Sequence, residues 1–410
     1  MPAVPLGTCL KMVDIPINNC MSAGINKIYV LTQFQSQVLN SYITNSYPPL
    51  RFGGPDRQSW VDVLAAQQTS TEKEWYQGSA DAVRRNVAEL MDEARGVTPA
   101  TDYVILSGAA VYNMDVAALI AAHRDKGADI TIAMHAVSRA EAGSKGIAKV
   151  DPSSGRVLKF EEKPPPESLD RMRRELSPPG REEYLANMGI YVFKRQALFR
   201  LLSPSKAAVI THIGHHVVPT ALAQDMEVFA HQHHGYWHDV SSLKDFYEAN
   251  LDLSDPRGPL HMFEVENVVM ARGSILPPAH MHGAHVVDSA VGDGAVLSGC
   301  VIRRSLVGEC VYVGEGSVVE RSLLLGSPVW SSDAVRARAR AEGGRVYGVG
   351  RGCLLRGCIV DENATVGDDV KIVNVGGVQE ADRAEDEGYM IQDGIVVVMR
   401  NSIIPDGKVI

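Results

Sequence analysis

A six-residue repeat in the last third of the chain is the feature that most restricts its fold. Apolar residues recur at this spacing in two series: Val301, Val307, Val313, Val319 and Leu325, and then Leu354, Val360, Val366 and Ile372. Such a period, with small residues at the corners, is typical of a parallel β-helix, in which every sixth side chain stacks inward. We therefore predict a β-helix domain over residues 281–410.

The two series are separated by a segment that cannot continue the coil. It reads "SPVWSSDAVRARARAEGGR", with three arginines at alternate positions, and we expect a loop inserted near residues 327–345. A solvated insertion and a subunit contact both fit this composition, and the sequence does not separate them.

Residues 1–255 follow a different pattern, in which short apolar runs alternate with amphipathic helices. "KIYVLTQF", "DYVILSG" and "DITIAM" are typical of buried strands, and "DVAALIAAHRDKG" of a helix. This alternation predicts βαβ units and a parallel sheet. The predicted fold class is therefore α/β, with a Rossmann-like domain, a linker over 256–280, and then the β-helix.

The segment "GSADAVRRNVAELMDEA" predicts a further helix in this first domain. Ser79 is the expected N-cap, and Val83, Val87 and Leu90 belong to an apolar face at three- and four-residue spacing. The free N–H groups at such a helix start can bind a phosphate, although any helix offers them.

Composition narrows the class of partner. The 410-residue chain is 45% hydrophobic and 22% charged, with a net charge of -9 and no sustained run of Lys and Arg. This balance argues against nucleic acid or an anionic membrane as the main partner, and no apolar run approaches the roughly 18 residues of a membrane span. Small molecules and other subunits are the expected partners.

Cysteines and histidines provide no strong metal motif. The six cysteines form no CxxC pair, so we interpret them as reduced thiols in a core. Four histidines in "HQHHGYWH" (His231, His233, His234 and His238) have only Asp239 as a nearby carboxylate. We favour surface histidines over a zinc site here.

Blocks of sequence along the entire chain carry a specific resemblance. These blocks are "PAVPLG", "VDIPINNC", "VLAAQQT", "YQGSADAVR", "FEEKP", "ANMGIYVF", "GYWHDV", "DENATVGDDVKIVN" and "IPDGKVI". In order and spacing the chain resembles ADP-glucose pyrophosphorylase (glucose-1-phosphate adenylyltransferase), with the closest likeness to its plant and algal branch. The resemblance implies a Rossmann-like nucleotidyltransferase domain, a left-handed parallel β-helix, and formation of ADP-glucose and pyrophosphate from ATP and glucose 1-phosphate with Mg²⁺.

The same resemblance implies the site residues. Nucleotide contacts would come from Gln68, Gly78, Ser79, Ala80 and Asp81. Sugar-phosphate contacts would come from Gly146, Glu162, Lys163 and Asn187, with the Lys163 ammonium on the phosphate. Asp239 would be a metal ligand, and it and Lys163 are the expected catalytic residues.

Two departures from the family predict weak catalysis. The family block resembling "LSGDHLYRMD" is here "LSGAAVYNMD", so Ala109 replaces a metal-binding aspartate and weakens the Mg²⁺ site. We expect the rate to fall at least about 10²–10³-fold. The glycine-rich loop resembling "GGGxGTRLxPLTxxRAK" and the first strand are also missing, which fits either an incomplete chain or a decayed paralogue.

The effector site is partly retained. Lys27, Lys371 and Arg383 match basic positions that would bind phosphorylated effectors, whereas Ser41-Tyr42 and Gln392 replace basic residues. The leading hypothesis is a regulatory, large-type subunit that joins a catalytic small-type subunit in a heterotetramer. Its location would be the plastid stroma for a plant or alga and the cytoplasm otherwise. The alternatives are an active adenylyltransferase with a truncated N-terminus and, from the hexapeptides alone, an acyltransferase.

Overall fold

The computed structural model describes residues 3–33, 36–48, 60–66, 75–91, 100–176, 183–203, 210–255, 257–260, 275–342 and 344–410. Contacts divide the described chain into two compact units, which we describe in turn. The first, here called the sheet unit, runs from Ile15 to Trp237. The second, the β-helix unit, contains the described residues before Ile15 and after Trp237.

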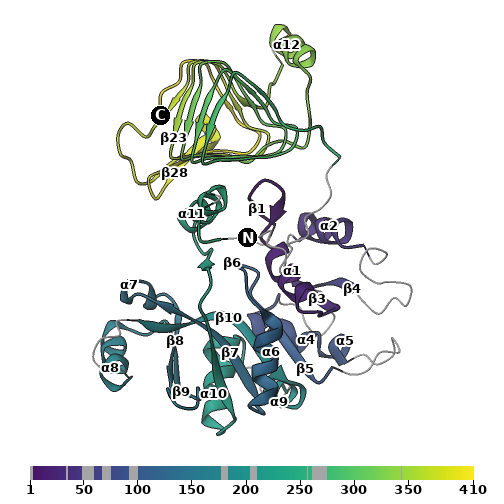
Figure 1. The fold of residues 1–410 in the computed structure, drawn as a ribbon, viewed down its shortest axis with the longest axis vertical. Coiled ribbons are helices and arrows are strands. Elements are labelled where there is room, and N and C mark those ends of the chain that lie inside the picture. The colour runs from purple at the N-terminus through teal and green to yellow at the C-terminus, as the bar shows by residue number, and fades with distance from the viewer. Residues whose placement is uncertain are drawn as a thin grey trace. The chain divides into compact units, whose positions relative to one another are not determined.

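A mixed six-stranded sheet forms the centre of the sheet unit (Figure 1). Its order is β11 (Val228–His233), β7 (Ile130–Val137), β10 (Tyr184–Lys194), β8 (Gly146–Val150) and β9 (Val157–Glu162), and β5 (Asp102–Leu106) also pairs with β10. Its core includes Ile130, Ile132 and Phe193, all fully buried. The α/β class is confirmed.

The prediction of a parallel sheet holds only in part. The pairs β7–β11 and β3–β4 (Lys27–Thr32 and Trp60–Ala65) are parallel, but β10 is antiparallel to β5, β7 and β8. The β8–β9 hairpin reverses the chain without a crossover helix, so the strand that follows is not constrained to a parallel direction. Among the described residues β3 pairs only with β4, and β5 only with β10.

Short helices accompany these strands. They are α1 (Asp14–Ser22, across the unit boundary), α2 (Gln37–Ser46), α4 (Ser79–Arg85), α5 (Val87–Met91), α6 (Val116–Asp125), α7 (Arg139–Ala142), α8 (Pro166–Leu176), α9 (Arg195–Leu201), the π-helix η2 (Ile213–Val217) and α10 (Val218–Ala223). The predicted helix in "DVAALIAAHRDKG" is confirmed as α6, and the Asp115 side chain caps it by accepting the Ala118 N–H at 2.9 Å. Two short strands, β6 (Ala110–Tyr112) and β12 (Trp237–Asp239), complete this part of the chain.

The β-helix unit stacks three parallel sheets around an apolar core (Figure 1). One face holds β13 (His280–His282), β16 (Val296–Ser298), β19 (Tyr312–Val313), β22 (Gly348–Val349), β25 (Thr365–Val366) and β30 (Ile403–Ile404). The second holds β14 (His285–Val287), β17 (Val301–Arg303), β20 (Val318–Glu320), β23 (Leu354–Arg356) and β26 (Lys371–Ile372). The third holds β15 (Ala290–Val291), β18 (Leu306–Val307), β21 (Leu323–Leu324), β24 (Cys358–Val360), β29 (Ile395–Val398), β28 (Tyr389–Gln392) and β27 (Ala381–Arg383), the last two added antiparallel.

The predicted inward positions are right for six of the nine residues and wrong for three. Ile302, Leu324 and Leu355 are the buried residues, whereas their neighbours Val301, Leu325 and Leu354 are only half-buried. Paired residues on successive coils are 16 or 17 positions apart, as in Val296–Tyr312 and Val301–Val318. Three sides of six residues would need 18, so some sides of the coil are five residues long and shift the inward position by one.

The predicted insertion leaves the coil between β21 and β22 without changing its register, since Tyr312 pairs with Gly348. It contains a helix, α12 (Asp333–Ala341), where we expected a loop. Arg336 anchors this helix: its side chain is 7% exposed, its guanidinium lies 4.8 Å from the Tyr312 ring centre, and it donates to Ser331 O and to Asp333. A second insertion forms β27, the helix α13 (Ala384–Glu387) and β28.

Residues near the start of the chain pack against the β-helix. The short hairpin β1 (Pro5–Leu6) and β2 (Leu10–Lys11) precedes α1, and α11 (Leu243–Ser254) precedes the coils. The Gly7 N–H donates to Asn250 Oδ1 of α11 at 2.8 Å, and the Tyr247 hydroxyl of the same helix donates to the Arg321 carbonyl. None of the described helices has the length and hydropathy needed to cross a membrane.

Candidate functional site

The "GSADA" turn is held against the segment that precedes η2. Thr211 O accepts the N–H groups of Ala80 and Asp81 at 2.8 and 3.2 Å, and Ser79 Oγ accepts the Ile213 N–H at 3.1 Å. A Cβ on Gly78 would lie 2.5 Å from Thr211 O, so only glycine fits this approach. Gly78, rather than the predicted Ser79, is the N-cap, and the predicted helix is interrupted at Asn86.

Asp81 is a structural anchor of this turn. Its carboxylate, 4% exposed, accepts the Gln77 N–H at 3.0 Å and forms ion pairs with Arg84 and Arg85. Burial raises the pKa of Asp81, but the Gln77 N–H and the two arginines outweigh it and lower the pKa overall. With these partners Asp81 fixes the turn that presents Gly78 and Ser79.

Three predicted sugar-phosphate residues converge on neighbouring strands. Gly146 on β8 pairs in register with Glu162 on β9, and Asn187 lies on β10. A Cβ on Gly146 would lie 2.6 Å from Glu162 Oε2 and 3.4 Å from the Asn187 Cβ. The structure therefore brings Gly146, Glu162 and Asn187 together.

Glu162 lies in a half-buried position bounded by a second glycine. A Cβ on Gly214 of η2 would lie 2.9 Å from Glu162 Oε2 and 3.3 Å from the Tyr191 hydroxyl, which accepts from Asn187 Nδ2 at 2.6 Å. Burial raises the pKa of Glu162, and Lys163, His215 and His212 oppose this shift. A carboxylate between two glycine backbones, with nearby cations, is suited to accept hydroxyl groups of a ligand.

Lys163 directly follows this carboxylate and has a strained backbone. Its φ of 47° is in the left-handed region, which non-glycine residues seldom adopt, while its N–H donates to Lys145 O at 3.0 Å. Such outliers gather at functional sites. The side chain is exposed, so its ammonium can reach an anion.

The histidines of "THIGHH" were not among the predicted site residues. His212 and His215 are exposed, and the His215 and His216 rings meet edge to face at 4.6 Å between centres. His216 Nδ1 accepts the His212 N–H at 3.2 Å. Three histidines within five residues were the available signal, but only the fold places them beside Glu162.

The residues present do not fit a two-aspartate Mg²⁺ site. Ala109 is half-buried just before β6, and its methyl group has no donor atom; its own N–H is directed to Ser107 Oγ at 3.3 Å. Within the described residues, no group of three or more His, Cys, Asp and Glu side chains has metal-binding geometry. Asp239 lies in β12 at the start of the β-helix unit's second segment.

The remaining predicted residues are placed as follows. Gln68 lies outside the described residues. Lys27 begins β3, with its ammonium 5.9 Å from the Trp60 ring centre, whereas Lys371 and Arg383 are exposed on β26 and β27. In the β-helix unit Arg383 lowers the pKa of Glu387, after the larger effects of Lys408, which pairs with that carboxylate.

The other histidines and the cysteines have structural surroundings. His231 and His233 are half-buried on β11, where burial lowers their pKa values, and His234 is exposed. All six cysteines are free thiols, and five are buried. Burial raises the pKa of Cys20 and of Cys358 to about 12, which keeps these two thiols protonated and unreactive.

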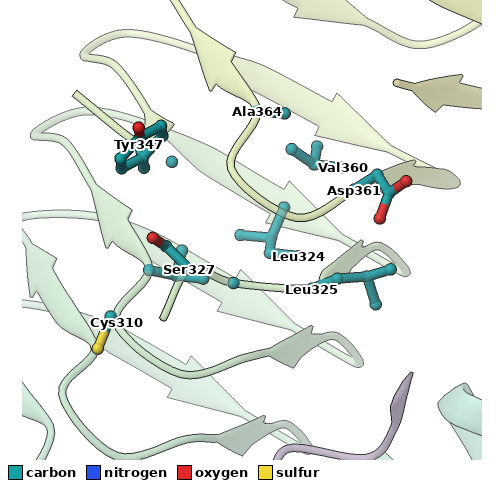
Figure 2. A pocket seen from close by; sticks show the side chains of 11 residues that line it. Cys310, Leu324, Leu325, Ser327, Tyr347, Val360, Asp361 and Ala364 are labelled. Carbon is teal, nitrogen blue, oxygen red and sulfur yellow. The ribbon is translucent and has the colours of Figure 1, made fainter. Parts of the chain in front are cut away.

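A small hollow in the β-helix unit is separate from these residues (Figure 2). It lies where the inserted segment leaves and rejoins the coil, and the labelled lining residues are Cys310, Leu324, Leu325, Ser327, Tyr347, Val360, Asp361 and Ala364. Burial raises the pKa of Asp361, whose Oδ1 accepts the Glu362 N–H at 2.7 Å. None of the predicted site residues lines this hollow.

Comparison with known families assigns both parts of the chain. Residues 1–255 match the nucleotidyl transferase family, and residues 274–409 match the GLGC left-handed parallel beta-helix domain. The second match identifies the observed β-helix as left-handed, as predicted. The chain therefore belongs to the nucleotidyl transferase family, and its two domains together fit a GLGC-type glucose-1-phosphate adenylyltransferase.

Proposed function

We propose that this chain is a regulatory, large-type subunit of a heterotetrameric glucose-1-phosphate adenylyltransferase. The complex converts ATP and glucose 1-phosphate into ADP-glucose and pyrophosphate for starch or glycogen synthesis. A catalytic small-type subunit performs most of the turnover, and this chain contributes assembly surface and effector binding. Ala109 carries the proposal, because it stands where the resemblance expects a carboxylate.

The residues around Glu162 support retained sugar-phosphate binding. The Glu162 carboxylate accepts sugar hydroxyls, Lys163 binds the phosphate, and the fixed Asn187 amide limits the room beside them. A bound Mg²⁺ would neutralise charge on the transferring phosphate, and the alanine side chain at position 109 supplies no ligand for it. Binding without efficient turnover is the expected result.

A second candidate is an active adenylyltransferase. Lys163 and Asp239 are both present, and they favour this reading over a chain that has lost its whole site. The hexapeptide coils alone would also suit an acyltransferase, but the group formed by Gly146, Glu162 and Asn187 has no role in that chemistry. Effector binding through Lys27, Lys371 and Arg383, and a plastid location, belong to the same proposal as the regulatory role.

The experiment measures ADP-glucose formation with Mg²⁺ by this chain alone, by a small-type subunit alone, and by the two co-expressed. The proposal expects a rate for the chain alone about 10²–10³-fold below that of the small-type subunit, and a changed effector response in the mixture. Lys163→Gln in this chain should leave the turnover of the complex unchanged. Fast turnover by the chain alone, abolished by Lys163→Gln, would establish the second candidate instead.

A further inference from the structure

The loop before and within η2 brings two exposed histidines near Glu162. His212 and His215 lie on either side of Gly214, whose Cβ position is 2.9 Å from Glu162 Oε2, so the loop that carries them approaches the carboxylate at Gly214. Both histidines and Lys163 act electrostatically on Glu162. Three basic side chains therefore surround one carboxylate.

His216 fixes this arrangement without adding charge. Its Nδ1 accepts the N–H groups of His212 and Thr211, at 3.2 and 3.4 Å. An accepting Nδ1 carries no proton, so the His216 ring is neutral with its proton on Nε2. Burial, followed by His215 and His212, lowers the pKa of His216. His216 thus serves as an acceptor that shapes the loop. The His212 ring lies beside the Gly78 turn, where a Cβ on Gly78 would be 2.7 Å from its Cε1, and His215 is exposed.

The balance of charge around Glu162 depends on His212 and His215. Glu162 and Lys163 offset each other, Asn187 and Tyr191 on β10 are uncharged, and the Asp81 carboxylate of α4 is already paired with Arg84 and Arg85. Protonation of both histidines adds two positive charges. This surplus matches the charge of a phosphate monoester dianion.

We propose that His212 and His215 join Lys163 in binding the phosphate of a sugar phosphate whose hydroxyl groups contact Glu162. The inference rests on the proposed function, and it adds a property that the Lys163 site alone lacks. Affinity for the sugar phosphate increases as the pH falls from 8 towards 6.

The direction in which sugar-phosphate affinity changes with pH distinguishes a site that binds the phosphate with Lys163 alone from one that also uses His212 and His215. A phosphate monoester has its second pKa near 6, so its dianion fraction roughly doubles between pH 6 and pH 8, and a site with lysine alone binds about twofold tighter at pH 8. Histidines lose their charge over the same range. Two exposed histidine–phosphate pairs at the upper end of the usual strength weaken binding about 30-fold when they lose their charge, and the doubled dianion fraction offsets about twofold of this, so binding is roughly tenfold weaker at pH 8 than at pH 6.

The test is isothermal titration calorimetry of the full chain with glucose 1-phosphate at pH 6 and pH 8. The variants are the double substitution His212→Gln/His215→Gln, the single substitution Lys163→Gln, and His234→Gln as a control at an exposed histidine elsewhere in the sheet unit. Circular dichroism verifies that each variant is folded. Inorganic phosphate and glucose serve as the separate anion and sugar ligands.

The expected result is weaker binding at pH 8 for the wild type and for His234→Gln, and a reversed, about twofold pH effect for the double variant. Unchanged affinity and pH dependence in the double variant, with binding still lost in Lys163→Gln, would overturn the histidine role and leave the proposed function intact. Absence of glucose 1-phosphate binding to the folded wild type at both pH values would overturn the proposed function as well. Equal affinity for inorganic phosphate would overturn the assignment to a sugar phosphate.

Discussion

Replacing Gly146 with alanine tests the close packing of Glu162 and Phe160 against this glycine. The new Cβ would lie 2.6 Å from Glu162 Oε2 and 2.7 Å from the Phe160 Cζ, both closer than carbon atoms tolerate. Phe160 is 6% exposed within the sheet-unit core, and Gly214 limits the room for Glu162 on its other side. Phe160 must therefore move within the core, and the half-buried Glu162 carboxylate must move away from residue 146.

Overpacking of this kind costs about 1–3 kcal/mol. For a unit of this size each kcal/mol lowers the melting temperature by about 2–4 °C, so Gly146→Ala should lower it by about 2–12 °C. The displaced carboxylate should also weaken glucose 1-phosphate binding. Thermal unfolding followed by circular dichroism, together with calorimetric titration, measures both effects.

Gly143→Ala is the matched control in the adjacent turn. A Cβ there meets no atom within 4 Å, and its φ of -66° and ψ of -18° suit any residue. This substitution should be neutral or stabilise the protein by about 0.4–1 kcal/mol. If Gly146→Ala melts within 1 °C of both the wild type and Gly143→Ala, then the close approach of Glu162 and Phe160 to residue 146 is wrong.

Three further predictions concern stability. Ser317→Ala removes a fully buried hydroxyl that donates to a carbonyl at 2.8 Å and accepts an N–H at 3.0 Å, and should lower the unfolding free energy by about 1–3 kcal/mol in urea titrations. Arg336→Ala should destabilise the β-helix unit by about 1–2 kcal/mol, because it removes the contact of the guanidinium with the Tyr312 ring. Arg338 is exposed, so Arg338→Ala should destabilise the unit by less than about 0.5 kcal/mol. Equal urea midpoints for the two variants would contradict this prediction. Burial lowers the pKa of His123, and Asp102 partly opposes this shift, so the unfolded chain takes up the proton at a higher pH than the folded chain does. Stability should therefore fall as the pH drops from 7 to 5, and the decrease in urea midpoint between these two pH values should be smaller for His123→Gln than for the wild type.

The β-helix could be predicted because its core repeats along the sequence. Val307, Val313 and Val319 keep the six-residue period and are all fully buried. Val301 was predicted to point inward, but the inward residue is its neighbour Ile302, because the side of the coil that follows has five residues instead of six. Since Val301 and Ile302 are both apolar, the sequence does not show which of the two points inward. Local spacing gives the architecture, but the length of each side is set by how the coils stack.

The insertion and β10 show what local sequence could not provide. Alternate arginines favour neither a strand nor a helix, and α12 is anchored by the contact of Arg336 with Tyr312, on a coil far back in the sequence. The direction of β10 depends on the hairpin before it, and an apolar run carries no sign of direction. Both features are set by tertiary contacts.

At the candidate site the sequence indicated individual residues but not their neighbours. Gly146, Glu162 and Asn187 could be named from motifs, and their strands do bring them together. His212 and His215 were missed because their spacing matches no metal or catalytic motif. Their relation to Glu162 exists only once η2 packs against β9 and β10.

The packing of the β1–β2 hairpin against α11 affects the order in which the molecule can form. Leu6 and Leu10 of the hairpin are almost fully buried, and the hydrogen bond from Gly7 joins it to Asn250, 243 residues later. At a translation rate of about 5–20 residues per second, Asn250 is synthesised about 10–50 s after the hairpin, and the apolar residues of the hairpin stay exposed during that time. The whole sheet unit is synthesised within this interval, so the hairpin residues are made before it but reach their native contacts only after it is complete.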